Sequence, residues 1–305
     1  MARYVQQHSC RSIAYEGKGT ARRQGDKVFN IPARKLNTLT AKVGFIGLGL
    51  MGSRLARRLH ANRWSIRVWN RSPQPWAEVN KEGIASAPSV ASLVADSDVI
   101  LSSLANDGAV RSVYFDKDGV FSAAEPGTVN IEMSTISPEL SRSLHREAQA
   151  RGVNFLDVAI SGSTPAVDAG TITLLAGGDH ETFEQCVPIF ESIAKQWFRI
   201  GPASAGIQMK LVVNLLLGLH MQAIAEAVSL GEHLRVDRNV LLDVLSKTAV
   251  IAPAMVGKLL KIKESDYTPQ FPLRLMSKDM DLVMDVARKS GADLPAASVA
   301  NPYLL

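Results

Sequence analysis

The chain has few cysteines, no evident metal-ligand spacing and no uninterrupted apolar run of membrane-spanning character. Its 305 residues include two cysteines, Cys10 and Cys186, which excludes a disulfide scaffold and fits a reducing compartment. The longest apolar stretch, 211–230, is interrupted by polar residues such as Asn214 and Glu226. This stretch is too polar for a membrane span and predicts a buried helix. The six histidines and two cysteines are not spaced as metal ligands, so no metal is expected.

Low-complexity segments and obvious repeats are also missing, and the length is sufficient for two domains. The hydrophobic content of 46% fits a globular protein with a substantial core. The net charge of +5 is unevenly distributed, because residues 1–40 hold eight Lys or Arg and two acids. The basic excess therefore belongs to the N-terminal segment and does not indicate a nucleic-acid-binding fold.

Residues 1–41 have the composition of an extension. They lack the continuous apolar core of a secretory signal. They are rich in Arg and poor in acid, as organelle transit peptides are, and a disordered extension or a start codon placed too far upstream fits equally well. We expect a basic, disordered segment that is dispensable for catalysis, in a cytoplasmic protein. Organelle transit stays open as the alternative.

The most informative motif is a glycine-rich loop between an apolar run and a helical pattern. Residues 43–52 are Val-Gly-Phe-Ile-Gly-Leu-Gly-Leu-Met-Gly. Gly47 permits the tight turn out of the strand, Gly49 lets the backbone approach a pyrophosphate, and Gly52 lets the helix pack close to the sheet. The helix N-terminus adds free N–H groups and a partial positive charge. This order predicts a dinucleotide site rather than a plain turn.

The end of the next predicted strand indicates which dinucleotide binds. An NAD site usually carries Asp or Glu about 20 residues beyond the glycines, where it holds the ribose 2′-hydroxyl. Here Asn70 and Arg71 follow the strand at 66–69. A guanidinium can hold a 2′-phosphate through two charge-assisted hydrogen bonds. The sequence therefore predicts NADP(H), and the alternative is that Arg71 is an ordinary solvated charge.

Strands and helices alternate from residue 42 and then give way to helices alone. The alternation predicts a doubly wound parallel sheet of Rossmann type, covered on both faces. Strands are expected at 42–46, 66–69, 98–104, 128–132, 154–158, 172–176 and 197–200, with helices near 50–62, 107–114, 138–151 and 181–194. Gly and Pro residues at 201–206 mark a boundary. The fold class is thus an α/β domain at 42–204 followed by an all-helical domain at 205–305, with helices at 208–232, 237–248 and 274–290.

Three polar segments lie where a ligand cleft between the two domains is expected. Residues 132–138 follow a strand and precede a helix that Thr135 or Ser137 caps. Residues 157–163 form a small-residue turn that either binds a carboxylate or is an ordinary turn. In the third segment, Lys210 and Asn214 lie one turn apart on an apolar helix. The lysine there is either a functional amine or a surface residue that extends its ammonium to water.

Five motifs occur in the order typical of the β-hydroxyacid dehydrogenase family. They are the glycine loop, Met133-Ser134-Thr135, Ser161-Gly162-Ser163, Lys210-x-x-x-Asn214 and Lys278-Asp279-Met280. The chain resembles this family from residue 42 to about 300. Within it, the chain is most similar to the glyoxylate/succinic semialdehyde reductases, which are 3-hydroxyisobutyrate dehydrogenase-like. That branch assignment rests on Asn70-Arg71-Ser72, Ser161-Gly162-Ser163 and Phe271-Pro272-Leu273.

The resemblance implies a role for each matching residue. Lys210 corresponds to the catalytic lysine and Asn214 to the residue that orients substrate and lysine. Substrate binding is implied for Ser161, Gly162, Phe271 and Asp279. Cofactor binding is implied for Gly47, Leu48, Gly49, Leu50, Met51, Asn70, Arg71, Leu104, Thr135 and Lys278. The implied reaction is hydride transfer from NADPH to a small aldehyde acid such as glyoxylate or succinic semialdehyde.

Two departures from the family and three alternatives remain open. The family has no counterpart of residues 1–41, and relatives continue for some helical turns beyond Leu305, so we expect a truncated helical domain. The alternatives are a 3-hydroxyisobutyrate-type dehydrogenase, an inactive interaction module on the same fold, and an imine-reducing enzyme. The last two would be expected to lack Lys210. The expected partners are small aldehyde or hydroxy acids and a second copy of the chain in a dimer or tetramer, with no nucleic acid and no membrane.

Overall fold

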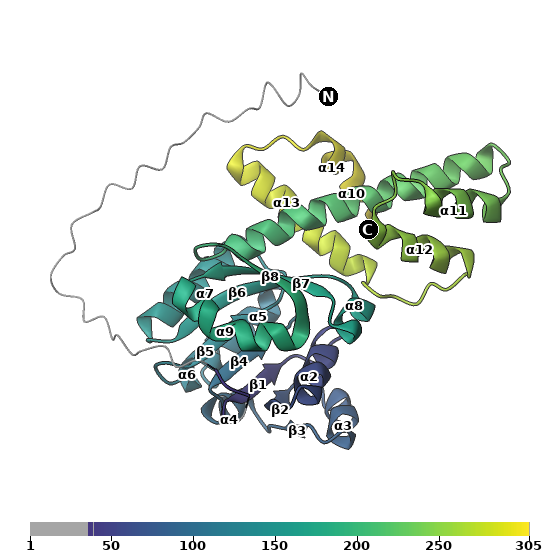
Figure 1. The fold of residues 1–305 in the computed structure, drawn as a ribbon. Coiled ribbons are helices and arrows are strands. Elements are labelled where there is room, and N and C mark those ends of the chain that lie inside the picture. Colours follow the sequence, from purple (N-terminus) through teal and green to yellow (C-terminus); the bar gives the residue numbers. More distant parts are fainter. Residues whose placement is uncertain (1–35, 39, 305) are drawn as a thin grey trace. The chain divides into compact units, whose positions relative to one another are not determined.

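A computed structural model describes residues 36–38 and 40–304 of the chain. One sheet runs through its first part in the strand order β3-β2-β1-β4-β5-β6-β7-β8 (Figure 1). Every strand predicted from the sequence is present, and the two-residue β3 was missed. The strands are β1 (Lys42–Ile46), β2 (Ser65–Trp69), β3 (Ala85–Ser86), β4 (Val99–Ser102), β5 (Val129–Glu132), β6 (Asn154–Ser161), β7 (Ile172–Gly178) and β8 (Ala194–Gly201).

The sheet is not parallel throughout, which corrects the sequence prediction. Strands β1 to β6 pair in parallel, whereas β7 runs antiparallel to β6 and β8 runs parallel to β7. A parallel crossover needs a dozen or more residues. The connection from β6 to β7 contains only the short helix α8 (Thr164–Ala169) and a few turn residues. The chain therefore turns back at Gly170, which has a φ of 66° and ends α8.

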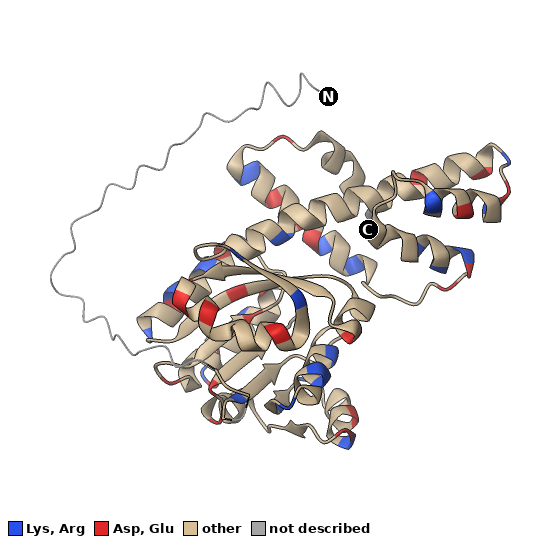
Figure 2. Ribbon diagram, viewed as in Figure 1, with Lys and Arg blue, Asp and Glu red and all other residues tan. Residues whose placement is uncertain are grey.

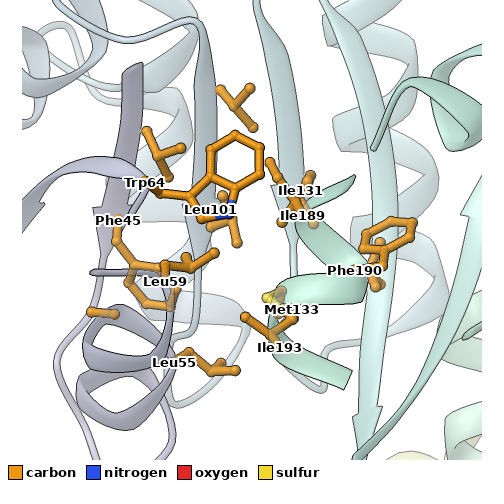
Figure 3. Close-up of a cluster of buried hydrophobic side chains, with 14 of the residues drawn as sticks. Phe45, Leu55, Leu59, Trp64, Leu101, Ile131, Met133, Ile189, Phe190 and Ile193 are labelled. Atoms are coloured by element: carbon orange, nitrogen blue, oxygen red, sulfur yellow. The ribbon is translucent and has the colours of Figure 1, made fainter. Parts of the chain in front are cut away.

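Helices cover both faces of the sheet, as the alternation predicted. Strand side chains alternate between two buried clusters, with Phe45 and Leu101 in one and Ile46 and Ile100 in the other. The helices of this part are α2 (Gly52–Ala61), α3 (Gln74–Lys81), α4 (Val90–Ala95), α5 (Asp107–Phe115), α6 (Val120–Ala123), α7 (Pro138–Ala150), α8 and α9 (His180–Ile193). Figure 3 shows the first cluster, where residues of α2 and α9 surround Phe45, Leu101 and Ile131.

The second part is helical, and its long helix α10 (Ala205–His233) is packed by the others. The remaining elements are α11 (Arg238–Lys247), α12 (Pro253–Lys263), α13 (Leu273–Ser290), α14 (Pro295–Ala300) and the 3₁₀-helix η1 (Asn301–Leu304). One small core joins Ile224 to Leu242 and Leu259, and another joins α10 to α13. A Cβ at Gly218 would lie 2.7 Å from the sulfur of Met280, so this glycine permits the close approach of α10 and α13.

Helix α10 is more exposed than the sequence predicted. It is long and apolar enough to cross a membrane, with a mean hydropathy of 1.6 over a window of which 22% is buried. One such helix is weak evidence for a span, because core helices of soluble proteins pass the same test. The exposed side chains include Val212, Leu216 and Leu230. The expectation of a buried helix is therefore wrong for this face of α10.

The folded body begins before residue 42. Leu36 and Ala41 are buried and belong to the cluster around Phe45. The turn at 37–41 is closed by hydrogen bonds from the backbone N–H groups of Thr40 and Ala41 to the carbonyl of Asn37. This corrects the end of the predicted extension. The rest of its range, 1–35, together with Cys10, lies outside the described residues.

Candidate active site

The candidate site is a cavity of about 670 Å³ between the carboxyl ends of the strands and the helical part. Its walls come from the glycine loop, the segments after β4, β5 and β6, and helices α10, α12 and α13. The strand order changes direction between β1 and β4, and ligands of open α/β sheets bind at such a point. The volume is typical of small-molecule and cofactor sites.

The three glycines of the loop differ in their surroundings. Gly47 has a φ of +95°, and a Cβ there would lie 2.3 Å from the carbonyl oxygen of Ser103. A Cβ at Gly52 would lie 2.0 Å from the carbonyl oxygen of Gly47, so the start of α2 packs directly on the turn. A Cβ at Gly49 would meet nothing within 4 Å, and this residue lines the cavity. The backbone at Gly49 is thus open to a ligand.

The N-terminus of α2 has the properties of a phosphate site. Met51 is the N-cap residue of this helix, and its side chain makes no capping hydrogen bond. The first turn of the helix carries no acidic residue. The helix dipole and the free N–H groups at this end favour an anion. Leu50, Met51 and Gly52 line the cavity beside Gly49. The residues present therefore fit a dinucleotide pyrophosphate.

Asn70 and Arg71 lie outside the cavity wall. The Oδ1 atom of Asn70 accepts a hydrogen bond from the Leu48 N–H at 3.0 Å, and its Nδ2 donates to the carbonyl of Ser72 at 3.0 Å. Asn70 thus connects the glycine loop to the end of β2. Arg71 is exposed. Arg71 directly follows Asn70, which is bonded to the glycine loop.

The segments after β4 and β5 are connected by hydrogen bonds. The Leu104 N–H donates to Ser134 Oγ at 2.7 Å, and the Ser134 N–H donates to Glu132 Oε1 at 2.7 Å. Leu104 and Thr135 line the cavity as predicted. Ser137, the other predicted cap, accepts the Leu140 N–H at the start of α7. Thr135 is therefore left for the cavity, and Ser137 caps the helix.

Glu132 is a buried carboxyl group beneath these segments. It is fully buried, and its Oε2 atom bonds to Ser102 Oγ, which in turn lies 2.8 Å from the Tyr114 hydroxyl. Burial raises the pKa of Glu132 to about 7, against the opposing effect of the hydrogen bonds from Ser102 and Ser134. The carboxyl group and both serines form a polar layer that fixes the two cavity segments relative to each other.

The raised pKa of Glu132 makes stability depend on pH. Its value rises from the ordinary 4.5 to about 7 on folding. The contribution of Glu132 to the free energy of unfolding is therefore fully present below its pKa in the unfolded chain. It is lost as the pH rises through its pKa in the folded protein. Between pH 4.5 and 7 the wild type should lose roughly 3 kcal/mol relative to Glu132→Gln, since one pKa unit is 1.36 kcal/mol. Urea unfolding at several pH values measures this difference.

Glu125→Gln is the matched control for that experiment, because Glu125 is exposed. Its unfolding free energy should follow that of the wild type at each pH. If the unfolding free energy of Glu132→Gln changes with pH as much as that of the wild type, the buried carboxyl group does not titrate in this range.

Lys210 extends from the first turns of α10 into the cavity. Burial lowers the pKa of its ammonium to about 8; the charge of Lys278 adds to this, and that of Asp279 opposes it. Among residues 36–38 and 40–304, no hydrogen bond or ion pair engages this ammonium. A half-shielded amine with a pKa close to neutral can both give and take a proton.

A buried polar chain connects Lys278 and Asn214 through one carboxylate. Asn214 is fully buried, and its Nδ2 donates to Asp279 Oδ2 at 2.6 Å. The ammonium of Lys278 lies 2.7 Å from Asp279 Oδ1 and also donates to the Thr135 carbonyl. Burial raises the pKa of Asp279, and Lys278, Lys210 and Asn214 oppose the shift. These linked polar side chains thus connect α10 and α13 to the segment after β5.

Asn214 keeps one atom available to a ligand. Its Oδ1 is buried and has no hydrogen-bond partner among the described residues. Unpaired buried acceptors are rare, because each costs free energy. Asn214 lines the cavity one turn beyond Lys210. A ligand hydroxyl or amide in the cavity would satisfy this atom.

Ser161 and Gly162 form the cavity wall where β6 ends. Gly162 has a φ of +143°, and a Cβ there would lie 2.8 Å from Ile172 Cγ2. Other residues are therefore strained at this position. Ser163 is the N-cap residue of α8, and its side chain makes no capping hydrogen bond. The turn offers backbone N–H groups and the Ser161 hydroxyl to an anion.

The first turn of α10 is anchored by Asp157 of β6. This fully buried carboxylate accepts hydrogen bonds from the N–H groups of Ser204 at 2.8 Å and Ile207 at 2.9 Å. His145 Nε2 of α7 lies 2.8 Å from the same carboxylate. A Cβ at Gly206 would lie 2.4 Å from the Leu175 carbonyl oxygen, so α10 starts in direct contact with the sheet. Asp157 thereby sets the position of Lys210, one turn further on.

Most of the predicted residues converge on one cavity. Those that line it are Lys210, Asn214, Ser161, Gly162, Phe271, Asp279, Gly49, Leu50, Met51, Leu104, Thr135 and Lys278. Gly47, Leu48, Asn70 and Arg71 lie beside it. Four further residues that were not predicted from the sequence also line it: His220, Met255, Lys258 and Arg274. A signal for α12 was available, because Pro253 precedes apolar residues at 255, 259 and 262, a helical spacing.

Within the described part of the chain, no three His, Cys, Asp or Glu side chains form a metal-binding group. Cys186 is buried, and burial raises the pKa of its thiol. Its thiol lies in the hydrophobic cluster of α9 and is no candidate nucleophile.

Two family models together match nearly all of the described chain. Residues 42–201 match the NAD binding domain of 6-phosphogluconate dehydrogenase. Residues 204–304 match the model described as NAD-binding of NADP-dependent 3-hydroxyisobutyrate dehydrogenase. Together with the fold and the cavity, these matches define a dinucleotide-binding oxidoreductase. The chain belongs to the β-hydroxyacid dehydrogenase family.

Relatives in this family differ in cofactor and substrate. Glyoxylate/succinic semialdehyde reductase 1 of Arabidopsis thaliana is 32% identical over 260 residues, covering 85% of this chain and 90% of the relative. The NAD-dependent L-serine dehydrogenase of Pseudomonas aeruginosa is 32% identical over 266 residues, 85% and 89% of the two chains. A crystal structure of 3-hydroxyisobutyrate dehydrogenase from Salmonella typhimurium has a TM-score of 0.80 and 29% identity, covering 87% of this chain and 93% of that one.

Proposed function

We propose that the protein is an NADPH-dependent reductase of small aldehyde acids such as glyoxylate or succinic semialdehyde. The observation that carries the proposal is the position of Lys210. It combines a pKa lowered to about 8 with a free ammonium in a cavity beside Asn214 and an open glycine loop. The similarity to the Arabidopsis reductase supports the substrate class.

The bound cofactor would supply the hydride, and the chain's own residues would hold it. Gly47, Leu48 and Gly49 form the loop for the pyrophosphate, with Leu50 and Met51 at the start of α2. Leu104 and Thr135 lie at the ends of β4 and β5, where the ribose and nicotinamide would lie. Lys278 lies above Thr135 from the helical part. Asn70 holds the loop, and Arg71 would pair with the 2′-phosphate.

The remaining residues supply binding, orientation and a proton. The Ser161–Gly162 turn would bind the substrate carboxylate, and Phe271 would form an apolar wall that excludes water. Negative charge grows on the carbonyl oxygen as its carbon gains a hydride. Lys210 would stabilise this charge and transfer a proton from Nζ to the oxygen, leaving a neutral amine and a hydroxy acid. Asn214 and Asp279 would orient the lysine and the substrate.

The reverse reaction, oxidation of a 3-hydroxyisobutyrate-type acid, is the second candidate. It needs the neutral amine of Lys210 as a base. A pKa of about 8 leaves part of the amine neutral near pH 7.5, which supports this direction as well. An inactive interaction module is disfavoured by the presence of Lys210, Asn214 and the open loop together.

Spectrophotometry of the cofactor tests these functions. NADPH oxidation is followed at 340 nm with glyoxylate, with succinic semialdehyde and with methylmalonate semialdehyde, and NADP⁺ reduction with 3-hydroxyisobutyrate. Turnover of an aldehyde acid supports the reductase. Turnover of the hydroxy acid alone favours the dehydrogenase, and binding of NADPH without turnover of any compound supports the inactive module.

Arg71→Ala is expected to weaken NADPH binding and to leave NADH binding nearly unchanged. A hydrogen bond to a charged group contributes about 1.5–3 kcal/mol, so the dissociation constant should rise roughly 10- to 150-fold. Titration of cofactor fluorescence measures both constants. Lys81→Ala, an exposed cation at the end of α3, is the control and should change neither. Equal weakening of both cofactors would assign Arg71 a structural role.

The exposed apolar side chains support a homo-oligomer, a dimer or tetramer. Val212 and Leu216 of α10 are 56% and 55% exposed, and Val240 and Val244 of α11 are 55% and 56% exposed. Extended apolar surface of this kind marks an interaction site. Size-exclusion chromatography with light scattering gives the number of subunits. A monomer at micromolar concentration would contradict the proposal.

A further inference from the structure

Two carboxylic acids lie side by side inside the sheet, at the carboxyl ends of neighbouring strands. Figure 2 shows the charged residues mainly on helices and loops. The strands of the described chain contain two acidic residues, Glu132 of β5 and Asp157 of β6. Both are fully buried, and they are register partners on adjacent parallel strands. Because such strands lie about 5 Å apart, the two side chains project from the same face as neighbours. Asp157 anchors α10, and Glu132 supports the segments after β4 and β5.

A single residue, Ser134, connects Glu132 to the wall of the cavity. Glu132 itself does not line the cavity. The Ser134 N–H donates to Glu132 Oε1, and Ser134 Oγ accepts the Leu104 N–H, both at 2.7 Å. Ser134, Leu104 and the next residue, Thr135, do line the cavity. A change at the buried carboxyl group therefore reaches the cavity wall through Ser134.

The hydrogen bonds of Glu132 fit the carboxyl group in both protonation states. As a carboxylate it accepts from the Ser134 N–H and from the Ser102 hydroxyl, which can accept from Tyr114. As a neutral acid it still accepts from Ser134 and donates its own proton to Ser102 Oγ, which can then donate to the Tyr114 oxygen. Serine and tyrosine hydroxyls both donate and accept, so this row of bonds can reverse without movement of the heavier atoms.

Among the described residues, no cation forms an ion pair with Glu132. The titratable and charged groups around it and its bonded neighbours come from four elements: Tyr114 of α5, Asp157 of β6, His145 of α7 and Lys278 of α13. Burial and the charge of Glu132 raise the pKa of Tyr114, so this hydroxyl stays neutral. Burial raises the pKa of Glu132 to about 7, and both of its forms therefore exist near neutral pH.

We propose that Glu132 is a positioning residue for the bound dinucleotide, which holds the segments after β4 and β5 in its neutral form and weakens binding when it is ionised. The dinucleotide is an anion, so a negative charge directly behind the cavity wall opposes it. Glu132 touches neither cofactor nor substrate and acts through Ser134. The inference rests on the proposed function in one respect, the position of the cofactor along Leu104 and Thr135.

Fluorescence titration with NADPH, without substrate and at pH values below and above 7, tests this coupling. The neutral form binds more tightly, so bound cofactor raises the pKa of Glu132 above its value in the free protein. The dissociation constant should therefore rise as the pH passes through about 7, and level off above the pKa of the complex. Like charges about 10 Å apart inside a protein weaken binding roughly tenfold, which is the expected size of the rise.

Glu132→Gln keeps the side chain neutral at every pH. The amide oxygen can accept the Ser134 N–H, and the amide nitrogen can donate to Ser102 Oγ as the neutral acid does. This variant should match the wild type below pH 7 and bind NADPH roughly tenfold more tightly than the wild type above it. Loss of a structural contact would not increase affinity. Glu125→Gln, an exposed residue ahead of β5, is the matched control and should follow the wild type at each pH.

Ser102→Ala tests the proton directly, because Ser102 is fully buried and does not line the cavity. Its hydrogen bond lowers the pKa of Glu132. Without it, the rise in the NADPH dissociation constant should move to higher pH, while the affinity at low pH is retained. If Glu132→Gln binds NADPH no more tightly than the wild type above pH 7, the proposal is wrong. An unchanged midpoint in Ser102→Ala contradicts it as well, even if Glu132→Gln does not fold.

Two comparisons separate this role from other causes and from the proposed function. The 2′-phosphate of NADPH titrates equally with every variant, and the difference between wild type and Glu132→Gln should be the same with NADH. A difference confined to NADPH would mean that the effect passes through the 2′-phosphate, which overturns the proposal. If no aldehyde acid is reduced but NADPH binding shows the predicted difference, the proposed function fails and the role of Glu132 stands.

Discussion

Lys210→Met is expected to lower kcat for aldehyde reduction by roughly 10²–10⁴-fold, the usual contribution of a general acid. Methionine keeps most of the volume of the lysine, so the apolar side of α10 should pack as before. NADPH should still bind, because the loop at Gly49 and the start of α2 are independent of the lysine. Stopped-flow and steady-state assays at 340 nm measure kcat, and fluorescence titration measures cofactor affinity.

The same lysine predicts the direction of the pH dependence. Its pKa is lowered to about 8, chiefly by burial. The protonated amine donates in the reductive direction, so kcat/KM for reduction should fall as pH rises through about 8. The neutral amine accepts in the oxidative direction, so kcat/KM for oxidation should rise over the same interval. Lys210→Met should remove both dependences.

Lys247→Met is the control for this substitution, because Lys247 is exposed in the last turn of α11. It should retain the wild-type kcat and the wild-type pH profile. A Lys210→Met protein within threefold of the wild-type kcat would mean that another group supplies the proton.

Asp157→Ala is expected to destabilise the protein by roughly 2–6 kcal/mol. The substitution leaves the N–H groups of Ser204 and Ile207 without an acceptor, and each unsatisfied buried donor costs about 1–3 kcal/mol. His145 also loses its partner. Domains are stable by only about 5–15 kcal/mol, so this loss is a large fraction of the total. Urea unfolding followed by circular dichroism measures it.

The substitution should also affect catalysis through the position of α10. Lys210 follows Ile207 by one turn, and misplacement of a reacting group by about 1 Å can cost roughly 10²-fold in rate. In the fraction of Asp157→Ala protein that folds, kcat should therefore fall while the dissociation constant of NADPH changes little. Asp157→Asn retains one acceptor oxygen and should recover part of both losses.

Asp179→Ala provides the matched control, since Asp179 caps α9 away from the cavity and accepts the Thr182 N–H at 3.0 Å. Loss of an ordinary cap costs about 1 kcal/mol and should leave kcat unchanged. If Asp157→Ala costs no more than Asp179→Ala and keeps kcat, Asp157 acts only as a helix cap.

The sequence was sufficient to predict those elements whose conformation depends on residues close to one another in the chain. The glycine loop was predicted from its strand, its three glycines and the following helix, all within about 20 residues. The helix at 208–232 was predicted from its long apolar stretch, and the structure extends it to Ala205–His233. By contrast, the antiparallel β7 and the helix α12 were missed. The direction of β7 depends on the length of the connection through α8. The signal for α12, Pro253 followed by apolar residues at helical spacing, was present in the sequence but was not used.

The convergence of the site was predicted by resemblance and could not be derived from spacing. Lys210 and Asn214 share a helix face, which the sequence alone indicates. The hydrogen bond from Asn214 to Asp279 spans 65 residues, and the bond from Lys278 to the Thr135 carbonyl spans 143. No periodicity in the sequence reports separations of this size.

The sequence by itself determined the order of strands and helices, the position of the glycine loop, the change from α/β to helical structure after residue 201 and the family. These properties depend on short-range backbone preferences and on motifs in a fixed order. Only the tertiary structure decided that β7 reverses, that Asp157 anchors α10, that Leu36 joins the core and that Glu132 is buried beside Asp157. Each of these depends on which buried groups from distant parts of the chain meet, because desolvation and pairing energies arise only where the packed elements come into contact.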